Sequence, residues 1–561
     1  MDLSNEIYAY AIENAVSHGK TMPSVVLSKL FQHGLKKEQI KDFMPQINKI
    51  VAEVNAYNSS KLAEGFEKYK KFIKENKIVE VKGLKDLPNV RKGKKMVFRL
   101  APFPSGSLHI GNTKTYLLNA MYAEKYKGKI LLVIDDTIGS EEKKIIADAY
   151  DMIPDAFTWL GVKYAKPILY KSKRLEIYYG YAEQLIKKHK AYVCSCSQEK
   201  LHDNRVNGVE CACRQYELKI QMQRWKGMFL PSTQPGDFVL RLKTNMQDPN
   251  PAFRDRVLFR ISDRLHPLVG NRYKVWPLLE FSWAIDDHLL GVTHIIRGKE
   301  LMMEGQVQDF IWDVFKWPKP TLIYVGLVRI EGIEGKLSKS KAQKEVLSGE
   351  YSGWDDPRTW SVQSLRRRGI LAETLREFVE EIGLNQNDIS IPLDAIYSIN
   401  RKKIDLSSNR YSFVEDPIEI LIENAPKLKE IALRFHPEKT QKRILKIGTK
   451  FLISKKDFNE FKGKEVRLMG LYNIKLDYVS VFSSEENKQQ TQKVNWVCSG
   501  KDHAKKVRIM MPNGFYIKGM GDEGIAKLKK GQTIQFERFG FCRFDSFDKK
   551  TKEYEFWFAH D

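Results

Sequence analysis

Residues 99–112, with the sequence RLAPFPSGSLHIGN, are the stretch that decides the fold. The apolar run Met96–Leu100 predicts a strand in front of it, and helical spacing continues behind it to Tyr126. A turn from a strand into a helix brings unpaired backbone amides and the positive end of the helix dipole to one point. Because Gly106 and Gly111 let a ligand approach the backbone, the stretch predicts an anion site suited to phosphate.

His109 stands at the start of the predicted helix, where its ring can donate a hydrogen bond to charge that develops on a phosphate. Taken alone, a histidine in this position is more often a helix cap or a packed surface residue. A second string, KLSKS at residues 336–340, follows a predicted strand in a loop flanked by glycines. Alone it fits an ordinary solvated basic loop, yet the ammonium groups of Lys336 and Lys339 can also fold over a triphosphate and neutralise it.

The chain on either side of these strings divides into regions of different texture. Apolar residues recur at three- and four-residue spacing up to about residue 85, which predicts helices. From about residue 95, strands alternate with helices, and the strands expected include Lys129–Asp135, Thr293–Arg297 and Thr321–Val328. After about residue 410, many short strands alternate with turns, a spacing that favours β-barrels over a second α/β domain.

The predicted fold is therefore an α/β Rossmann-like domain with an insertion, preceded by a helical extension and followed by a helical connector and an all-β barrel region. The boundaries expected are 1–88 for the N-terminal helices, 89–345 for the α/β domain, about 194–255 for its insertion, 346–410 for the connector and 411–561 for the β region.

The net charge points to a polyanionic partner. In 561 residues, 94 Lys and Arg stand against 70 Asp and Glu, a formal charge of +24. Nucleic acid fits such a surplus best, an anionic membrane fits it less well, and a charge that serves only solubility is the plainest alternative. No apolar run approaches the ~20 residues that cross a bilayer, and the first residues lack the features of a signal peptide, so we expect a cytoplasmic protein without membrane contact.

Four of the six cysteines form two Cys-x-Cys pairs with 14 residues between them. In a cytosolic chain this arrangement indicates a metal before a disulfide. Four thiolates suit a tetrahedral structural Zn²⁺, because such a set leaves no open position; the alternative is a quartet of reduced, partly buried thiols. The four residues are Cys194, Cys196, Cys211 and Cys213.

Together and in this order, about 220 residues apart, HIGN and KLSKS resemble the HIGH and KMSKS signatures of the class I aminoacyl-tRNA synthetases. The β-rich tail, with FERFGF at 536–541, is similar to the archaeal and eukaryotic form of glutamyl-tRNA synthetase, whose anticodon-binding region is β-barrel. Further motifs that resemble the glutamyl/glutaminyl branch are DDT at 135–137, DDHLLGVTH at 286–294, RGKE at 297–300, WDDPR at 354–358 and LRRRG at 365–369.

The resemblance implies a ligase that uses ATP and Mg²⁺ to activate L-glutamate as glutamyl-adenylate and then transfers it to the 3′ end of tRNA(Glu), with tRNA(Gln) as a further possible substrate. His109, Gly111 and Asn112 would hold ATP, and Lys339, assisted by Lys336, would stabilise the α-phosphorus as pyrophosphate leaves. The chain shows no Ser-His-Asp or Cys-His arrangement, which agrees with a reaction that needs positioning and charge rather than an enzyme nucleophile.

The resemblance also implies the residues that hold glutamate. Arg99 would bind one carboxylate, Asp135 the ammonium group and Arg297 the side-chain carboxylate. Arg297 favours glutamate over glutamine, because a neutral amide would leave its buried guanidinium unpaired; the alternative is that Arg297 forms an internal ion pair in the sheet. Leu279 departs from the branch, since an aromatic hydroxyl often stands at this position.

Four other functions remain open at this point. A glutaminyl-tRNA synthetase would share nearly every motif but should lack a cation at position 297. A non-discriminating glutamyl-tRNA synthetase would differ in tRNA choice alone. A nucleotidyltransferase would share the phosphate loop without the basic surface or the β tail, and a non-catalytic tRNA-binding paralogue should have lost His109 or Lys339, both of which are present.

Overall fold

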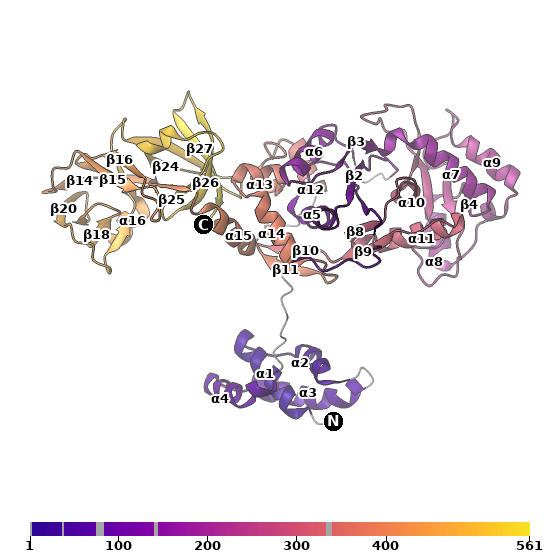
Figure 1. Cartoon of the computed structure of the whole chain (residues 1–561), viewed down its shortest axis with the longest axis horizontal. Coiled ribbons are helices and arrows are strands. Elements are labelled where there is room, and N and C mark those ends of the chain that lie inside the picture. Colours follow the sequence, from indigo (N-terminus) through magenta and orange to yellow (C-terminus); the bar gives the residue numbers. More distant parts are fainter. Residues whose placement is uncertain (1–2, 36–38, 74–82, 92, 140–143, 333–338) are drawn as a thin grey trace. The chain divides into compact units, whose positions relative to one another are not determined.

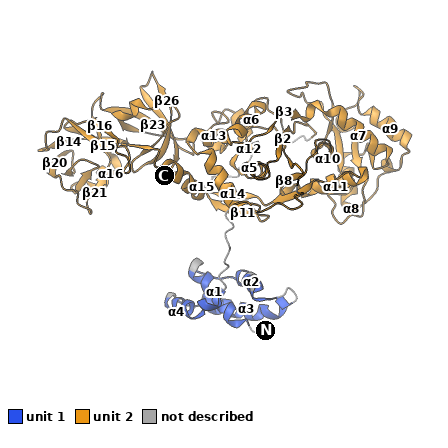
Figure 2. Cartoon of the chain, viewed as in Figure 1, with its two compact units in different colours: residues 1–82 blue, residues 83–561 orange. Residues whose placement is uncertain are grey.

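The structure is a computed structural model that describes residues 3–35, 39–73, 83–91, 93–139, 144–332 and 339–561 (Figure 1). Two compact units divide the chain, residues 1–82 and residues 83–561 (Figure 2). No helix among the described residues is long and apolar enough to cross a membrane.

The first unit is helical, as the apolar spacing predicts. Ile47, Ile50, Val51 and Val54 lie on one buried face of its third helix. Local signals explain the helix ends: α1 stops where Gly19 adopts a left-handed conformation, and the Asn58 side chain caps the start of α4. The four helices are α1 (Ser4–His18), α2 (Pro23–Leu30), α3 (Ile40–Asn55) and α4 (Ser59–Tyr69).

The second unit begins with parallel strands. β1 (Val97–Leu100), β2 (Lys129–Ile134) and β3 (Ala165–Tyr170) form one sheet, with β2 in the middle. β8 (His294–Gly298) and β9 (Thr321–Val325) form another, and Thr293 joins the two where its amide donates to the Val97 carbonyl at 2.9 Å. The resulting succession β3-β2-β1 and then β8-β9 is consistent with a Rossmann-like fold.

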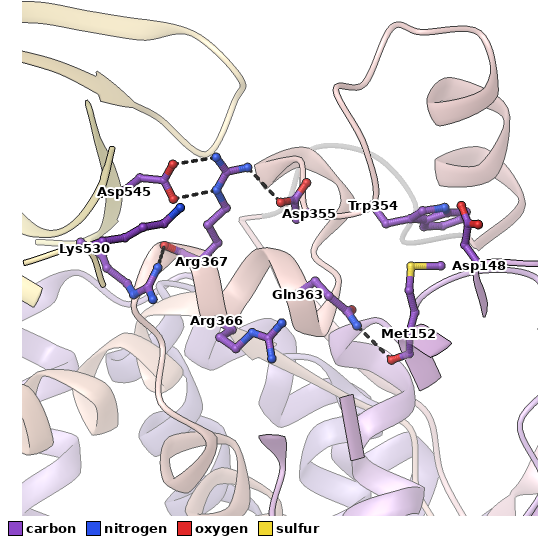
Figure 3. Close-up of a pocket in the computed structure, with 10 residues that line it drawn as sticks. Asp148, Met152, Trp354, Asp355, Gln363, Arg366, Arg367, Lys530 and Asp545 are labelled. Atoms are coloured by element: carbon purple, nitrogen blue, oxygen red, sulfur yellow. Dashed lines mark hydrogen bonds and ion pairs between the residues drawn. The ribbon is translucent and has the colours of Figure 1, made fainter. Parts of the chain in front are cut away.

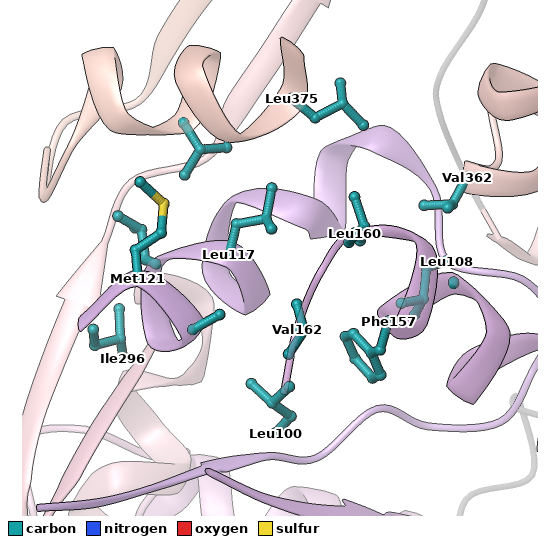
Figure 4. Close-up of a cluster of buried hydrophobic side chains, with 14 of the residues drawn as sticks. Leu100, Leu108, Leu117, Met121, Phe157, Leu160, Val162, Ile296, Val362 and Leu375 are labelled. Carbon is teal, nitrogen blue, oxygen red and sulfur yellow. The ribbon is translucent and has the colours of Figure 1, made fainter. Parts of the chain in front are cut away.

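Helices cover these strands and share one apolar core with them (Figure 4). Leu100 of β1, Leu117 of α5, Phe157 of α6 and Ile296 of β8 are each at most 3% exposed. Of the helices in this region, α5 (Ile110–Lys125) and α6 (Ala149–Trp159) contribute to this core. The helices α7 (Leu175–Lys187), α10 (Leu279–Leu289) and α11 (Met302–Phe315) contribute to a second core, which they share with an antiparallel sheet.

A four-stranded antiparallel sheet interrupts the parallel strands in sequence. It runs from Ala191 to Pro277, and its strands lie on both sides of the cysteine region in sequence. Its core contains Trp225, Phe259 and Trp276. Its elements are β4 (Ala191–Cys194), β5 (Val239–Leu242), β6 (Val257–Ile261), β7 (Val275–Pro277), α8 (Gln198–Asn207) and α9 (Leu218–Gly227).

The strand expected at 321–328 is divided in two. β9 ends at Val325, and a new strand begins at Val328 and pairs with a strand at Ile389–Pro392. Helices dominate the residues between these partners and after them, as predicted. The elements are β10 (Val328–Glu331), α12 (Lys339–Leu347), α13 (Val362–Arg368), α14 (Ala372–Ile382), β11 (Ile389–Pro392) and α15 (Leu393–Ile404).

Two seven-stranded sheets make up most of the C-terminal region, together with a hairpin and the helix α16 (Lys455–Phe461). One sheet has the order β12 (Asn409–Tyr411), β25 (Thr533–Phe536), β26 (Gly540–Asp548), β27 (Glu553–His560), β23 (Ala504–Met510), β24 (Tyr516–Asp522) and β13 (Phe413–Glu415). The other has the order β21 (Gln492–Val494), β18 (Glu465–Leu468), β19 (Asn473–Lys475), β20 (Val479–Ser484), β14 (Pro417–Glu423), β17 (Lys450–Ser454) and β22 (Val497–Cys498). The hairpin joins β15 (Glu430–Arg434) to β16 (Lys442–Lys446).

Candidate active site

His109 is the N-cap of α5, with an extended backbone conformation. Its Nδ1 accepts a hydrogen bond of 3.1 Å from the Gly111 amide. A neutral ring bonded in this way carries its proton on Nε2, where it can donate to a ligand. Gly111 packs closely against this ring, since a Cβ there would lie 3.0 Å from it and the ring would have to shift.

The expectation of unpaired amides at this helix start is wrong for its first three residues. The Ile110 amide donates to the Trp360 carbonyl, and the amides of Gly111 and Asn112 donate to the side chain and the carbonyl of His109. The site therefore offers an imidazole and the helix dipole to an anion, rather than a row of free amides. The buried Oδ1 of Asn112 has no hydrogen-bond partner among the described residues.

The second signature lies largely outside the described residues. Lys336 is not described at all, and of Lys339 the structure gives the backbone only, as the first residue of α12. Described residues before and after segment 333–338 nevertheless contact α5 and the loop that precedes it. Upstream, Lys114 of α5 donates to the Gly326 carbonyl at 3.0 Å. Downstream, the indole of Trp354 packs directly on Gly106, where a Cβ would lie 2.1 Å from the ring.

Arg99, Asp135 and Arg297 lie at the carboxyl ends of β1, β2 and β8, the edge of a parallel sheet where ligands bind. All three side chains are nearly buried, with 4% to 6% of each residue exposed. The structure thus places the three predicted glutamate-binding residues at the same edge of the parallel strands.

Arg99 already has an acidic partner. Its Nε and Nη2 donate to the two carboxylate oxygens of Asp287, with 3.2 Å between Nη2 and Oδ2. Its guanidinium also lies 4.6 Å from the centre of the Trp283 ring. Asp287 and Trp283 are four residues apart on α10, so one face of this buried helix supplies both contacts.

Arg297 has no carboxylate partner among the described residues. Its Nη1 donates to Gln308 at 2.6 Å, its Nη2 donates to the Tyr324 hydroxyl at 3.3 Å, and its buried Nε has no partner. The alternative reading of Arg297 as one half of an internal ion pair is therefore not supported. Burial lowers the pKa of this guanidinium from its ordinary value. A buried cation in this state is stabilised by an anion that enters the site.

Asp135 is paired with a lysine that the sequence reasoning missed. The Nζ of Lys171, which is fully buried, lies 3.2 Å from Asp135 and donates to the Ser282 hydroxyl at 2.8 Å. Burial lowers the pKa of Lys171, and the nearby acids Asp135 and Asp286 oppose the change. The one signal available was topological: Lys171 directly follows β3, which is the neighbour of β2.

Trp283 is the second residue that the sequence reasoning missed. Three cations lie about its ring: Arg99, Lys171 at 5.1 Å and Arg297 at 5.6 Å from the ring centre. Its buried indole N–H has no hydrogen-bond partner among the described residues. Leu279, the departure noted in the sequence, is the first residue of the same helix α10.

The four clustered cysteines converge. Their sulfur atoms all lie within 4.8 Å of one another, and the Sγ atoms of Cys194 and Cys211 are 3.7 Å apart. Thiolates bound to one tetrahedral Zn²⁺ at ~2.3 Å lie roughly 3.8 Å apart, so the set fits such an ion. A hydrogen bond from Cys194, with smaller effects of Tyr192 and Arg241, lowers the pKa of Cys211 to about 5. The other two cysteines of the set are Cys196 and Cys213.

A pocket of about 660 Å³ lies where α13 meets β26 (Figure 3). Arg367 projects between Asp355 and Asp545, with ion pairs of 2.9 and 2.8 Å. The next residue, Arg368, is fully buried and donates to the carbonyls of Phe558 and Ala559. This part of the LRRRG motif therefore ties the connector to β26 and β27.

Comparison with known families agrees with this geometry. The family "tRNA synthetases class I (E and Q), catalytic domain" matches residues 95–406. Two families described as "tRNA synthetases class I (E and Q), anti-codon binding domain" match residues 408–495 and 484–545. The first match includes every predicted site residue, and the other two lie within the β-rich region.

Curated relatives match over nearly the whole chain. The glutamate–tRNA ligase of Pyrococcus furiosus is 39% identical and that of Methanothermobacter marburgensis 35%, with 98% and 100% of both chains covered. A solved glutamate tRNA ligase from Elizabethkingia meningosepticum is more distant, with a TM-score of 0.41 and 19% identity over 56% of this chain and 71% of that chain. Since the catalytic-domain family covers more than half of the sequence and these relatives cover nearly all of it, the chain belongs to the class I (E and Q) tRNA synthetases.

Proposed function

We propose that this chain is a glutamate–tRNA ligase. The α-carboxylate of glutamate attacks the α-phosphorus of ATP, pyrophosphate leaves, and glutamyl-adenylate forms. The 2′-hydroxyl of the terminal adenosine of tRNA(Glu) then attacks the acyl carbon, and AMP leaves. The name of the full-length relatives, glutamate–tRNA ligase, supports this proposal.

The observation that carries the choice of glutamate is the state of Arg297. Its side chain is buried, and its guanidinium has no carboxylate partner among the described residues. The side-chain carboxylate of glutamate supplies the missing negative charge, whereas the amide of glutamine does not. A site built in this way rejects the neutral analogue because its own buried charge stays unpaired.

The ATP site lies at the start of α5. His109 donates from Nε2 to a phosphate oxygen, Gly111 leaves room for the ring, and the unsatisfied Oδ1 of Asn112 accepts a hydrogen bond from the nucleotide. Lys339 and Lys336 neutralise the pyrophosphate as it leaves. This role is supported by described residues on either side of the lysine-bearing segment in sequence, because Gly326 contacts Lys114 of α5 and Trp354 contacts Gly106 in the loop before α5. Mg²⁺ accompanies ATP and adds positive charge at the phosphates.

Arg99 and Asp135 are also part of the glutamate site. Unlike Arg297, each of them has an oppositely charged partner in the protein. Asp287 orients Arg99 toward one carboxylate of glutamate, and the ion pair with Lys171 holds Asp135 in place beside the ammonium group. Of the three cations around the Trp283 ring, Arg99 and Lys171 have acidic partners and Arg297 has none among the described residues. This surplus of positive charge favours a substrate with two carboxylates.

Zn²⁺ in the cysteine cluster has a structural role. Cys194, Cys196, Cys211 and Cys213 supply four ligands and so leave no position for a substrate. The ion would tie β4 to the segment before α9 within the antiparallel sheet.

The remaining regions bind tRNA. The antiparallel sheet from β4 to β7 is the insertion and receives the acceptor end; the β region, predicted from residue 411, reads the anticodon with exposed aromatic and basic side chains. The strand order supports closure of one of the two seven-stranded sheets into a barrel. The two edge strands of that sheet, β12 and β13, are separated in sequence by Ser412 alone. The predicted boundaries at residues 88, 345 and 410, the charging of tRNA(Gln) and the cytoplasmic location stay predictions.

Aminoacylation of separate tRNA(Glu) and tRNA(Gln) transcripts with labelled glutamate and with labelled glutamine tests the proposal. We expect glutamate to be attached to tRNA(Glu) in an ATP-dependent reaction and glutamine to be attached to neither. Attachment of glutamine in preference to glutamate would contradict the role of Arg297. Binding of tRNA without any aminoacylation would indicate a non-catalytic relative.

A further inference from the structure

A continuous chain of hydrogen bonds joins the two arginines of the glutamate site. Asp287 accepts from Arg99, the Gln308 amide donates to Asp287 Oδ2 at 2.9 Å, and Gln308 Oε1 accepts from Arg297 Nη1 at 2.6 Å. Four side chains from β1, α10, α11 and β8 are thereby connected in series. We call this series the arginine bridge.

The arginine bridge is shielded from water. Gln308 is 0% exposed, and Asp287 is 1% exposed. Hydrogen bonds and charges are not screened in such a place, so the positions of the linked groups depend strongly on one another. Close packing also restrains Arg297, because a Cβ on Gly305 would lie 2.7 Å from its Nη2.

Gln308 has a chemistry that neither an acid nor an apolar side chain can reproduce at this position. Its carbonyl oxygen accepts from a cation, and its NH₂ group donates to an anion. A carboxylate here would pair with Arg297 from inside the protein and would repel Asp287. A hydrocarbon would leave both charged neighbours without this partner.

We propose that Gln308 is a positioning residue that sets the separation of Arg99 and Arg297 and keeps the charge of Arg297 available for the substrate. Through this residue the enzyme selects an amino acid that carries a second carboxylate at the distance found in glutamate. The inference rests on the proposed function, and it assigns to an uncharged residue of α11 part of the discrimination against glutamine and aspartate.

Two buried donors indicate where the second carboxylate lies. Arg297 Nε and the indole N–H of Trp283 are buried and have no hydrogen-bond partner among the described residues, and the Arg297 guanidinium lies 5.6 Å from the Trp283 ring centre. One of these donors belongs to the Arg297 cation itself. Two such donors suit an incoming carboxylate, which accepts several hydrogen bonds.

The test uses the full chain with its tRNA(Glu) transcript and the variant Gln308→Glu. The substitution keeps the shape of the side chain and converts the amide into an internal anion beside Arg297. We expect the KM for glutamate to rise by about 100-fold, the preference for glutamate over glutamine in kcat/KM to fall by a similar factor, and the KM for ATP to stay within about twofold.

Two further variants accompany Gln308→Glu. Gln308→Met removes both hydrogen bonds without adding charge, and we expect it to raise the KM for glutamate by about 10-fold and to weaken discrimination against aspartate. It decides the question if Gln308→Glu does not fold. Gln306→Glu makes the same chemical change at an exposed position on the same helix and should leave all constants unchanged.

The outcomes separate this inference from the proposed function. If the unmodified enzyme does not attach glutamate to tRNA, the proposed function fails. If it does, and a folded Gln308 variant keeps the glutamate preference of the unmodified enzyme, the arginine bridge has no part in selection. Equal losses for glutamate and ATP would likewise overturn the positioning role, because they indicate general damage.

Discussion

At the scale of single residues, charge pairing explains the site. Arg99 and Asp135 each have an oppositely charged neighbour, whereas the hydrogen bonds of the Arg297 guanidinium among the described residues go to neutral oxygen atoms. The internal pairs orient their members, and under the proposed function the guanidinium without an acid is the group that distinguishes substrates. Under this proposal, selectivity for a dicarboxylic amino acid thus follows from one uncompensated buried charge.

Arg297→Gln should raise the KM for glutamate by about 100-fold or more. The substitution removes a positive charge that has no acidic partner among the described residues and is therefore available to the second carboxylate of the substrate. The KM for ATP should change little, because the ATP site is at the start of α5. Steady-state pyrophosphate exchange in the presence of tRNA measures both constants. Unchanged use of glutamate by this variant would remove the basis for the substrate assignment.

Some residues of the candidate site could be identified from sequence patterns. His109, Gly111 and Arg297 could be found because each belongs to a contiguous motif at the end of an apolar run. Lys171 could not, since its pairing with Asp135 depends on the alignment of β2 with β3, which no local spacing encodes. The unpaired amides expected at the α5 start were wrong because His109 caps its own helix, a geometry that the sequence alone does not give.

At the scale of elements, most helices and strands around the candidate site begin and end close to where the sequence predicts. The apolar runs and glycines predicted β1, α5, β2 and β8 within a few residues. The division between β9 and β10 was missed because the apolar spacing continues through it. At the division the Gly326 amide donates to the Asn385 carbonyl, and a Cβ on Gly326 would lie 2.0 Å from the Asn387 carbonyl oxygen.

The antiparallel sheet should depend on a bound metal. We expect about one zinc per chain by elemental analysis of the purified protein, and loss of that zinc in Cys211→Ser with a lower melting temperature. Cys498→Ser is the matched control, because Cys498 is a buried thiol of β22 far from the cluster in sequence and should not affect zinc content. Full zinc content in Cys211→Ser would exclude this set of ligands.

The contact of β27 with α15 should make stability depend on pH. His560 is fully buried against Asn400, and burial lowers its pKa to about 4 from the ordinary 6.5. The unfolded chain therefore binds the proton first as the pH falls. Stability is retained above about pH 6.5 and is lost down to pH 4, by up to about 3 kcal/mol.

Melting temperatures of the unmodified chain and of His560→Gln between pH 7 and pH 4.5 measure this effect. The variant should show a smaller decrease over that interval, because it has no group to protonate at this position. Parallel curves for the two proteins would show that other groups govern the acid sensitivity.

At the scale of the whole second unit, α13 joins the α/β domain to the β region. One end of this short helix pairs with the start of α5 through Ser361 and His109, and the other carries Arg367 to Asp545 of β26. The Arg367 guanidinium also lies 3.9 Å from the ring centre of Trp557. Such contacts between distant parts of the chain could not be predicted, since the arginine tract alone is equally typical of an exposed surface.

A double-mutant cycle with Arg367→Met and Asp545→Asn should give a coupling free energy of about 1 to 3 kcal/mol in thermal unfolding, because Asp545 is nearly buried and bonded twice. The pair Arg366 and Asp155 is the control. Both of its side chains are more than a third exposed, so its coupling should not exceed about 0.5 kcal/mol. Equal coupling in the two pairs would mean that Arg367 does not join the two regions.

The central claim is that the α5 start and the segment bearing Lys339 act on the same nucleotide. Pyrophosphate exchange with glutamate, measured beside tRNA affinity, tests it most directly in Lys339→Ala and in Lys344→Ala, an exposed lysine of the same helix α12. The account predicts that Lys339→Ala lowers kcat for exchange by about 100-fold or more with tRNA affinity intact, and that Lys344→Ala changes neither. Normal exchange in Lys339→Ala, or an equal loss of exchange and tRNA binding, would contradict it.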